Sequence, residues 1–274
     1  MSEHDTINRT KLPNTVSSIV RELTQLNIAK GDNLLVHSSL SSLGWVCGGA
    51  QAVVEALLES VGDRGTLTMP AQSGDWSDPS EWGNPPVPQE WFQTIYEEMP
   101  AFDAAVTPTR GMGSIAELFR TYPGTLRSQH PQVSFCSNGS IAEYIIADHP
   151  LTPQFGEDSP LGKLYNSGAK VLLLGVGFDS CTSFHLAETM LANMPVKKMG
   201  TAMFDDGERV WKWFEDYAYD AGDFAELGKS FAEAGAVQRG KIGEAECMFF
   251  DLKEAVDFAC LWLERHRFSR EIRP

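Results

Sequence analysis

The segment Val171-Leu-Leu-Leu-Gly-Val-Gly-Phe-Asp-Ser-Cys-Thr-Ser-Phe-His-Leu-Ala-Glu188 contains an apolar run, two glycines and a histidine, in that order. A run rich in Leu and Val is typical of a strand buried on both faces, and the glycines allow a tight turn into a helix. His185 is therefore expected one turn inside a helix that follows the carboxyl end of a strand. Ligands bind in this crevice of open α/β sheets, so the imidazole is a candidate base. The alternative is a buried histidine with a structural role only.

The segments before this stretch predict an α/β fold with parallel strands. Residues 15–26 and 50–61 have helical spacing of their apolar positions, and residues 33–37 and 66–70 have the pattern of short buried strands. The order helix, strand, helix, strand implies a parallel pair joined by a right-handed crossover. Further helices are predicted at 89–99, 114–120, 141–147, 161–166, 224–234 and 252–265.

Two hairpins are predicted toward the end of the chain. Residues 196–204 and 209–214 alternate around an Asp-Asp-Gly turn at 205–207, and a second strand pair surrounds Gly243. The chain is expected to be a single domain over residues 1–274, with an antiparallel β-rich subregion at about 195–250. Residues 71–88 form a long loop without periodicity, and such loops commonly line a site.

Composition favours an acidic globular protein. The 274 residues carry 22 Lys and Arg against 37 Asp and Glu, a formal net charge of -15. Nucleic acid is not an expected partner because duplex binding requires a basic surface, whereas a cationic small molecule would be attracted. No apolar run approaches the ~20 residues that span a bilayer, so no membrane partner is expected. The first residues lack a secretory signal pattern, which predicts a cytoplasmic location.

The cysteines predict neither disulfides nor a metal site. There are five, widely spaced and without a CxxC pair, so we expect reduced thiols and no bound metal. Cys181 lies near His185 in sequence and is the one candidate for a nucleophilic thiol.

Five ordered blocks resemble those of the antibiotic N-acetyltransferases, the aminoglycoside 3-N-acetyltransferase family. They are HSSLSSLG at 37–44, TPTRGMG at 107–113 running into AELFR at 116–120, RSQHP at 127–131, DSPLG at 158–162, and 174–188 of the segment quoted first. The resemblance covers nearly the whole chain. It implies an αβα sandwich with an additional antiparallel β region, acetyl coenzyme A as cosubstrate, and acetylation of the 3-amino group of the 2-deoxystreptamine ring of an aminoglycoside antibiotic, which confers resistance.

The same blocks carry the residues expected to bind the coenzyme. Its phosphates require backbone donors at helix starts, hydroxyl groups and a few cations, and glycines let the backbone approach. Taken without the resemblance, the serine-rich loop is an ordinary strand-to-helix connection. The predicted cofactor-binding residues are His37, Ser38, Ser39, Leu40, Ser41, Ser42, Leu43, Arg110, Gly111, Gly113, Ser114, Arg120 and Ser128, with Arg127 as a further cation.

His185 is the predicted general base. Acetyl transfer to an amine requires removal of a proton from nitrogen, and the family resemblance implies that the histidine of this block accepts it directly in a ternary complex, without an acyl-enzyme. A carboxylate is expected to hold the second ring nitrogen. Glu215, at the end of a predicted strand, is favoured for this role over Glu188, and Asp179 comes third.

Acidic and aromatic residues of irregular segments are expected to bind the cationic substrate. Carboxylates would contact ammonium groups, and indoles would cover sugar faces. The predicted substrate-binding residues are Asp75, Trp76, Asp78, Trp82, Glu90 and Asp216, with Asp103 and Asp220 as possible members of the same wall.

Two other functions stay open from the sequence. The acceptor could be a different amine, such as a biosynthetic intermediate, or the chain could bind coenzyme A without catalysis. The assembly is expected to be a monomer or a homodimer.

Overall fold

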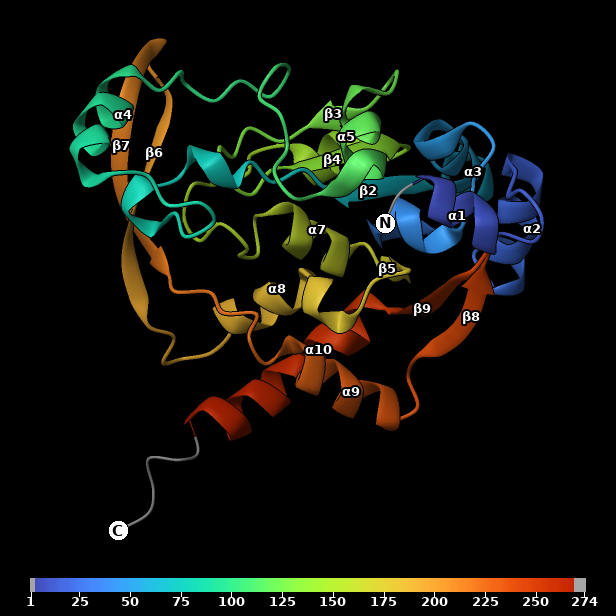
Figure 1. The fold of residues 1–274 in the computed structure, drawn as a ribbon. Coiled ribbons are helices and arrows are strands. Elements are labelled where there is room, and N and C mark those ends of the chain that lie inside the picture. The colour runs from blue at the N-terminus through green and yellow to red at the C-terminus, as the bar shows by residue number, and fades with distance from the viewer. Residues whose placement is uncertain (1–2, 269–274) are drawn as a thin grey trace.

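A seven-stranded mixed sheet forms the centre of the protein, seen in the computed structural model of the chain, which describes residues 3–268 (Figure 1). Its strands lie in the order β3-β4-β2-β1-β5-β9-β8. β1, β2 and β5 are parallel and every other pairing is antiparallel. The strands are β1 (Asn33–Ser38), β2 (Thr66–Pro70), β3 (Leu126–Arg127), β4 (Phe135–Gly139), β5 (Lys170–Leu174), β8 (Gln238–Ile242) and β9 (Ala245–Asp251).

Helices cover both faces of this sheet, which confirms the αβα architecture. One face carries α2 (Val16–Gln25), α3 (Gly49–Val61) and α5 (Gly113–Thr121). The other carries α6 (Ala142–Ile146), α7 (Pro160–Asn166), α8 (Ser183–Thr189), α9 (Phe224–Glu233) and α10 (Leu252–Leu263). Two further helices, α1 (Glu3–Arg9) and α4 (Phe92–Glu98), lie outside the two layers (Figure 1).

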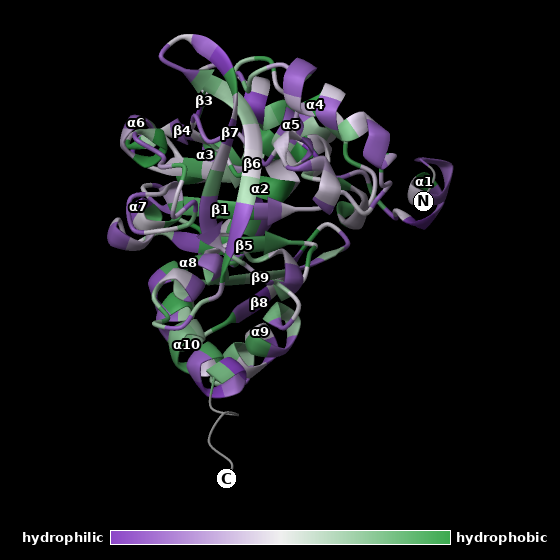
Figure 2. Ribbon diagram, turned by 90° about the vertical axis from the view of Figure 1, so that its left-hand side faces the viewer, coloured by the Kyte–Doolittle hydropathy of each residue, from purple (hydrophilic) through white to green (hydrophobic). Residues whose placement is uncertain are grey.

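Alternation along the central strands explains why both layers are needed. Leu172 and Leu174 pack in the core on one face of the sheet, while Val171 and Leu173 pack in the core on the other. All four are fully buried. Each such side chain stabilises the fold by roughly 1.5–3 kcal/mol relative to an exposed position. Figure 2 shows the resulting pattern, with apolar strands inside and polar residues on the outer surfaces of the helices.

The predicted hairpin near residue 200 forms a separate two-stranded sheet. Its strands are β6 (Val196–Asp205) and β7 (Glu208–Tyr217), and the turn between them is Asp206-Gly207. Both turn residues have positive φ, as a two-residue type I′ turn requires. The hairpin stands beside α4, where Tyr96 packs on Trp211 with ring centroids 4.8 Å apart (Figure 1).

Three features differ from the sequence prediction. The β-rich subregion at 195–250 is divided, because β8 and β9 extend the main sheet and only β6 and β7 stand apart. β3 and β4 were not predicted, since they are short and follow an irregular segment. α1 was not predicted, because Thr6 is its only buried residue. Residues 1–2 and 269–274 of the predicted domain lie outside the described residues.

Candidate active site

A cavity of about 370 Å³ opens where β1 and β5 end. β2 lies on one side of β1 and β5 on the other, so this is the point of the sheet where ligands are expected to bind. Gly175, directly after β5, has φ +71°, and a Cβ there would lie 2.6 Å from the Cβ of Ser42. A glycine is therefore required for the turn that brings the serine-rich loop beside the cavity. Both His37 and His185 line the cavity.

His185 is the third residue of α8 and is held by a carboxylate. Its Nδ1 lies 2.5 Å from Oε2 of Glu188, and its ring stacks on Phe155 at a centroid distance of 4.8 Å. An ionised carboxylate can only accept, so Nδ1 carries the proton and Nε2 is left with its lone pair. Within residues 3–268, Nε2 has no hydrogen-bond partner. The ring is thus fixed in the tautomer that a general base requires.

Glu188 is fully buried and both of its oxygens are occupied. Oε2 accepts from His185, while Oε1 accepts from the backbone N–H of Asp220 at 3.1 Å and from the guanidinium of Arg267. A buried carboxylate is tolerated only when it is paired in this way. The network ties α8 to the segment between β7 and α9 and to the end of the described chain.

Glu215 does not orient His185, contrary to the sequence prediction. Side chains alternate along β7, and Glu215 lies on the exposed face of the hairpin while Asp216 is buried. Asp179, the third candidate, lines the cavity but is not the partner of Nδ1. The partner of Nδ1 is Glu188, three residues further along the same helix. The two side chains meet because the ring of His185 and the carboxylate of Glu188 both turn inward.

Cys181 is not an activated nucleophile, although it lines the cavity. Burial raises the pKa of its thiol to about 12, so the thiolate is absent at neutral pH. All five cysteines are free. No group of three or more His, Cys, Asp or Glu side chains among residues 3–268 is arranged to hold a metal ion.

His37, at the end of β1, is neutral. Its Nε2 lies 3.3 Å from Oγ1 of Thr182, the residue before α8. Burial, together with the nearby His185, lowers the pKa of His37 to about 3. A neutral imidazole that contacts the start of α8 is suited to positioning this helix, and His37, predicted to bind the cofactor, does not line the second cavity described below.

Buried neutral histidines should make the fold sensitive to mild acid. Burial lowers the pKa of His130 to about 4, and its Nδ1 accepts the N–H groups of Gln132 and Val133, both at 3.1 Å. With His37, two histidines are therefore neutral when folded but titrate near 6.5 when unfolded. The unfolded state binds more protons below pH 6.5, so the stability contributed by each group is complete above that pH and falls as the pH drops.

We expect the free energy of unfolding to fall between pH 6.5 and 5 by up to about 1.4 kcal/mol per pH unit for each of these two histidines. Urea unfolding at several pH values measures the slope. A flat profile over this range would contradict the assignment of neutral buried rings.

A second cavity, of about 580 Å³, adjoins the first and shares Ser38, Gly111 and Met112 with it. Two helices begin at its wall, α3 at Gly49 and α5 at Gly113. Helix starts present free N–H groups and a positive partial charge, which suit phosphate. A Cβ added at Gly49 or Gly111 would meet nothing within 4 Å, so the backbone is accessible from the cavity.

Most of the predicted cofactor-binding residues line this second cavity. Those that do are Ser38, Ser39, Leu40, Ser41, Gly111, Gly113 and Ser114. Leu43 does not, since its side chain is fully buried in the core. Ser42 instead donates to the carbonyl of Gly175 at 3.0 Å, which fixes the loop against the end of β5. Ser128 is buried, 2.9 Å from Nδ1 of His149, and belongs to the packing beside β4.

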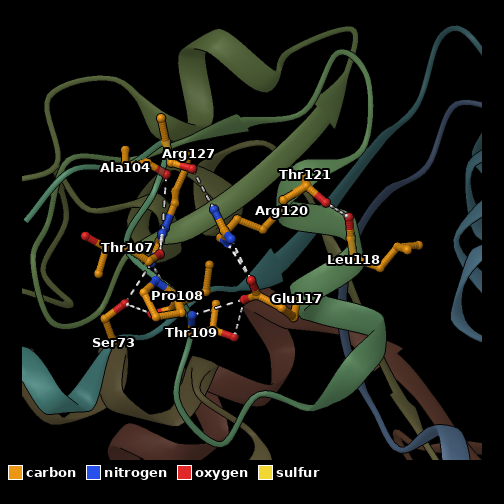
Figure 3. Close-up of polar contacts among 12 residues, drawn as sticks. Ser73, Ala104, Thr107, Pro108, Thr109, Glu117, Leu118, Arg120, Thr121 and Arg127 are labelled. Atoms are coloured by element: carbon orange, nitrogen blue, oxygen red, sulfur yellow. Dashed lines mark hydrogen bonds and ion pairs between the residues drawn. The ribbon is translucent and has the colours of Figure 1, made fainter.

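The predicted arginines have structural partners (Figure 3). Arg120 forms a 2.5 Å ion pair with Glu117 and donates to the carbonyl of Ala105. Arg127 is buried and donates to the carbonyls of Ala71 and Thr107, among others, and burial lowers its pKa to about 10. These two cations therefore hold loops together and do not reach the second cavity.

Arg110 is also engaged, with one of the predicted substrate-binding residues. Its guanidinium lies 3.0 Å from the carboxylate of Asp75, and its backbone N–H donates to Gln72. Both side chains are about half exposed. Arg110 lines neither of the two cavities.

Most of the acidic and aromatic residues predicted to bind the substrate instead make contacts that hold their own loop in place. Asp78 accepts from the hydroxyl of Tyr96 at 2.8 Å, and the indoles of Trp76 and Trp82 donate to Pro100 and Ser77. Glu90 is exposed and lines neither cavity. None of these residues reaches the His185 cavity, because the loop packs on the β6–β7 hairpin.

Asp216 holds the segment of chain that precedes Phe155. It accepts from the backbone N–H of Gln154 at 2.9 Å and from the hydroxyl of Thr152 at 3.2 Å. Phe155 is the residue after Gln154, and its ring stacks on His185. By holding Gln154, Asp216 therefore fixes the position of the aromatic ring that packs on the imidazole. It is buried and not available to a substrate.

Sequence reasoning missed the residues that come from the two ends of the chain. Glu3 and Thr6 of α1 line the second cavity, and Arg267 contacts Glu188. Arg267 lies 79 residues after Glu188, so no local pattern connects them. The one available signal was an Arg next to His266 at the end of an amphipathic helix, which does not indicate a partner.

Comparison with known proteins agrees with the geometry. Crystallised YokD from Bacillus subtilis superimposes with a TM-score of 0.96 at 46% identity, covering 98% of this chain and 100% of that one. AAC-IIIb in binary complex with CoASH superimposes with a TM-score of 0.81 at 32% identity, covering 93% and 97%. The fold is thus shared with crystallised aminoglycoside acetyltransferases such as AAC(3)-Xa, which superimposes with a TM-score of 0.87 at 33% identity, covering 96% of this chain and 97% of that one.

The sequences define the family. Residues 35–264 match the family model for aminoglycoside 3-N-acetyltransferase, and the chain belongs to that family. The YokD protein of Bacillus subtilis, described as aminoglycoside N(3')-acetyltransferase-like, is 48% identical over 93% of this chain and 94% of its own. Aminoglycoside N(3)-acetyltransferase VII of Streptomyces paromomycinus is 34% identical, over 100% of this chain and 99% of its own.

Proposed function

We propose that this protein transfers the acetyl group of acetyl coenzyme A to the 3-amino group of the 2-deoxystreptamine ring of an aminoglycoside, with His185 as general base. The observation that carries the proposal is the pairing of His185 with Glu188 beside a cavity that joins a second one bordered by two helix starts. The first cavity supplies a base and the second supplies anion-binding backbone. Such a resident activity would confer resistance to the acetylated antibiotic.

The reaction needs one base and no acyl-enzyme. The amine nitrogen attacks the thioester carbonyl, so that a C–N bond forms and the C–S bond breaks. Nε2 of His185 takes the proton from nitrogen, and the leaving thiolate is protonated to give the free thiol. A positioned base of this kind contributes roughly 10²–10⁴-fold in rate. The buried thiol of Cys181 supports direct transfer, since Met112 is the one other sulfur-containing residue among residues 3–268 that lines the His185 cavity.

The coenzyme is proposed to occupy the second cavity. Its phosphates would lie against the starts of α3 and α5, and the serine loop at 38–41 would supply hydroxyl and backbone groups. Its thioester end would reach the His185 cavity past Ser38, Gly111 and Met112, which both cavities share. Arginines play little part in this arrangement.

The substrate is proposed to enter the His185 cavity from the side of Asp179. This carboxylate is exposed and lines the cavity, so it is placed to contact an ammonium group. The strongly negative net charge of the chain would attract a polycation to this opening.

A thiol-release assay tests the proposal directly. Purified protein is mixed with acetyl coenzyme A and gentamicin, tobramycin, neomycin or apramycin in turn, and mass spectrometry with NMR locates the acetyl group. Thiol release with acetylation at the 3-amino nitrogen is the expected result. Acetylation at another nitrogen would overturn the regiochemistry, and no release from protein that binds coenzyme A would favour a different amine.

A charge placed at the start of α5 should weaken coenzyme binding selectively. Ser114 is the second residue of α5 and lines the second cavity, so Ser114→Glu puts a carboxylate where phosphate is proposed to bind. Acidic residues in a first turn favour the helix, so the fold should be retained. We expect the Kd for coenzyme A, measured by calorimetry, to rise at least about tenfold, which corresponds to about 1.4 kcal/mol.

The matched control is Ser17→Glu. Ser17 is the exposed second residue of α2 and lines neither cavity. It introduces the same charge at the same helical position, and coenzyme binding should be unchanged. Equal effects of the two substitutions would contradict the proposed coenzyme site.

A further inference from the structure

The side chain of Arg267 connects three segments that meet behind His185. It lies in η6 (Glu264–Phe268), a π-helical turn that follows α10. Its guanidinium contacts Oε1 of Glu188 and holds both carboxylate oxygens of Asp223, with Nε 2.7 Å from Oδ2 and Nη2 2.5 Å from Oδ1. It also donates to the carbonyl of Asp220 at 2.6 Å. Every nitrogen of the guanidinium is therefore engaged.

The arrangement is more than an exposed ion pair. Glu188 is fully buried, and the side chain of Arg267 is 16% exposed. Burial disfavours the charged guanidinium, but its hydrogen bonds to Asp223 and Glu188 outweigh that effect and raise its pKa. The two-point contact with Asp223 fixes the guanidinium plane. Asp223 precedes α9, whose first residue, Phe224, lines the His185 cavity.

The two carboxylate oxygens of Glu188 have different partners. Oε1 is taken by Arg267 and by the N–H of Asp220, which leaves Oε2 directed at Nδ1 of His185. If Oε1 lost its cation, the carboxylate would be free to rotate, and the orientation of the imidazole ring would be less well fixed. The orientation of the base thus depends on a residue beyond 264, where the match to the family model ends.

We propose that Arg267 is a positioning residue for the transfer reaction, which fixes Glu188 so that His185 keeps Nδ1–H bound and Nε2 toward the cavity. The inference rests on the proposed function of His185 as the base. Arg267 itself contacts no reacting atom. The last described turn of the chain thus acts on the base through Glu188.

Removal of this cation has a consequence that a merely structural contact would not have. His185 and Glu188 share a hydrogen bond, so loss of the neighbouring positive charge of Arg267 is expected to favour the protonated form of the imidazole. The charged and titratable side chains around the pair are His37 of β1, Tyr219 and Asp220 after β7, Asp223 before α9, and Arg267.

The test compares Arg267→Gln, Arg267→Lys and Arg265→Gln in the full chain. We expect R267Q to lower kcat about 10- to 100-fold, to leave the Kd for coenzyme A within twofold, and to move the acid side of the kcat/KM profile upward by about one pH unit. R267K retains the cation, so its profile should stay near that of the wild type. Arg265 is exposed in the same turn, and R265Q should behave as the wild type.

A readout without substrate separates this inference from the proposed function. The ring signals of the six histidines can be followed by NMR against pH, with His185 assigned from its absence in H185Q. An upward shift of the His185 titration in R267Q but not in R267K supports the positioning role even if no aminoglycoside is acetylated. An unshifted titration and rate profile in folded R267Q would overturn it, as would wild-type activity of that variant.

Discussion

His185→Ala is expected to reduce kcat by about 10²–10⁴-fold, while the Kd for coenzyme A stays within twofold of the wild type. The imidazole is the only group of the His185 cavity whose ring nitrogen is fixed by a buried carboxylate, among the residues that the structure describes. Without it, the attacking amine loses the one acceptor in this cavity that is oriented by a buried carboxylate, among the residues that the structure describes. Steady-state thiol release and calorimetric titration with coenzyme A measure the two quantities.

A second variant guards against loss of folding. Alanine at 185 leaves the buried Glu188 with one partner fewer, whereas His185→Gln can still donate a hydrogen bond to it. Glutamine cannot accept the proton, so H185Q should be as inactive as H185A but closer to the wild type in thermal unfolding. Restoration of part of the H185A rate by added imidazole would give further support. A folded H185Q that retains more than a tenth of the wild-type kcat would remove His185 from its role.

The scaffold of this site was predictable because it depends on local patterns. The Leu run at 171–174 alternates between two cores, and the glycine at 175 is required by a positive φ and a close approach to Ser42. These features fix His185 at the carboxyl end of β5 from the sequence alone. The same holds for the position of the serine loop after β1, whose members at 38–41 line the second cavity.

The partners of charged groups were not predictable in the same way. Arg120 and Arg127 were expected to bind phosphate, but each satisfies loop carbonyls or a neighbouring carboxylate. A long side chain in an acidic protein has many possible partners, and only the three-dimensional path of the loops selects among them. Arg267 is the opposite case, since its partner is the glutamate that holds His185 and lies far away in sequence.

Strand register explains why Glu215 does not face the site. The prediction of the β6–β7 hairpin was correct. Because side chains alternate along β7, only one of Glu215 and Asp216 can face inward. A shift of the strand register by one residue would exchange them. In the structure Asp216 is buried and Glu215 exposed. An estimate from sequence could place both acids near the site without deciding which one pointed at it.

Glu188→Gln and Glu215→Gln should therefore give opposite results. Glutamine at 188 can accept the Nδ1–H bond of His185, but it is neutral and cannot stabilise the imidazolium that forms when the base takes a proton. We expect E188Q to lower kcat by roughly 10²–10⁴-fold. E215Q removes the same charge from an exposed position and should leave kcat within twofold. Thiol release at saturating concentrations of both substrates makes the comparison.

The stability of the two variants must be measured alongside, because Glu188 also binds Arg267. Losing one buried charged partner costs about 3 kcal/mol or more, so E188Q should unfold at a lower temperature, while E215Q should not. Glu188→Asp keeps the charge at shorter reach, and recovery of part of the lost kcat in E188D would separate the electrostatic role from the loss of stability. Loss of kcat in E215Q with retention in E188Q would reverse the assignment and return the orienting role to the hairpin.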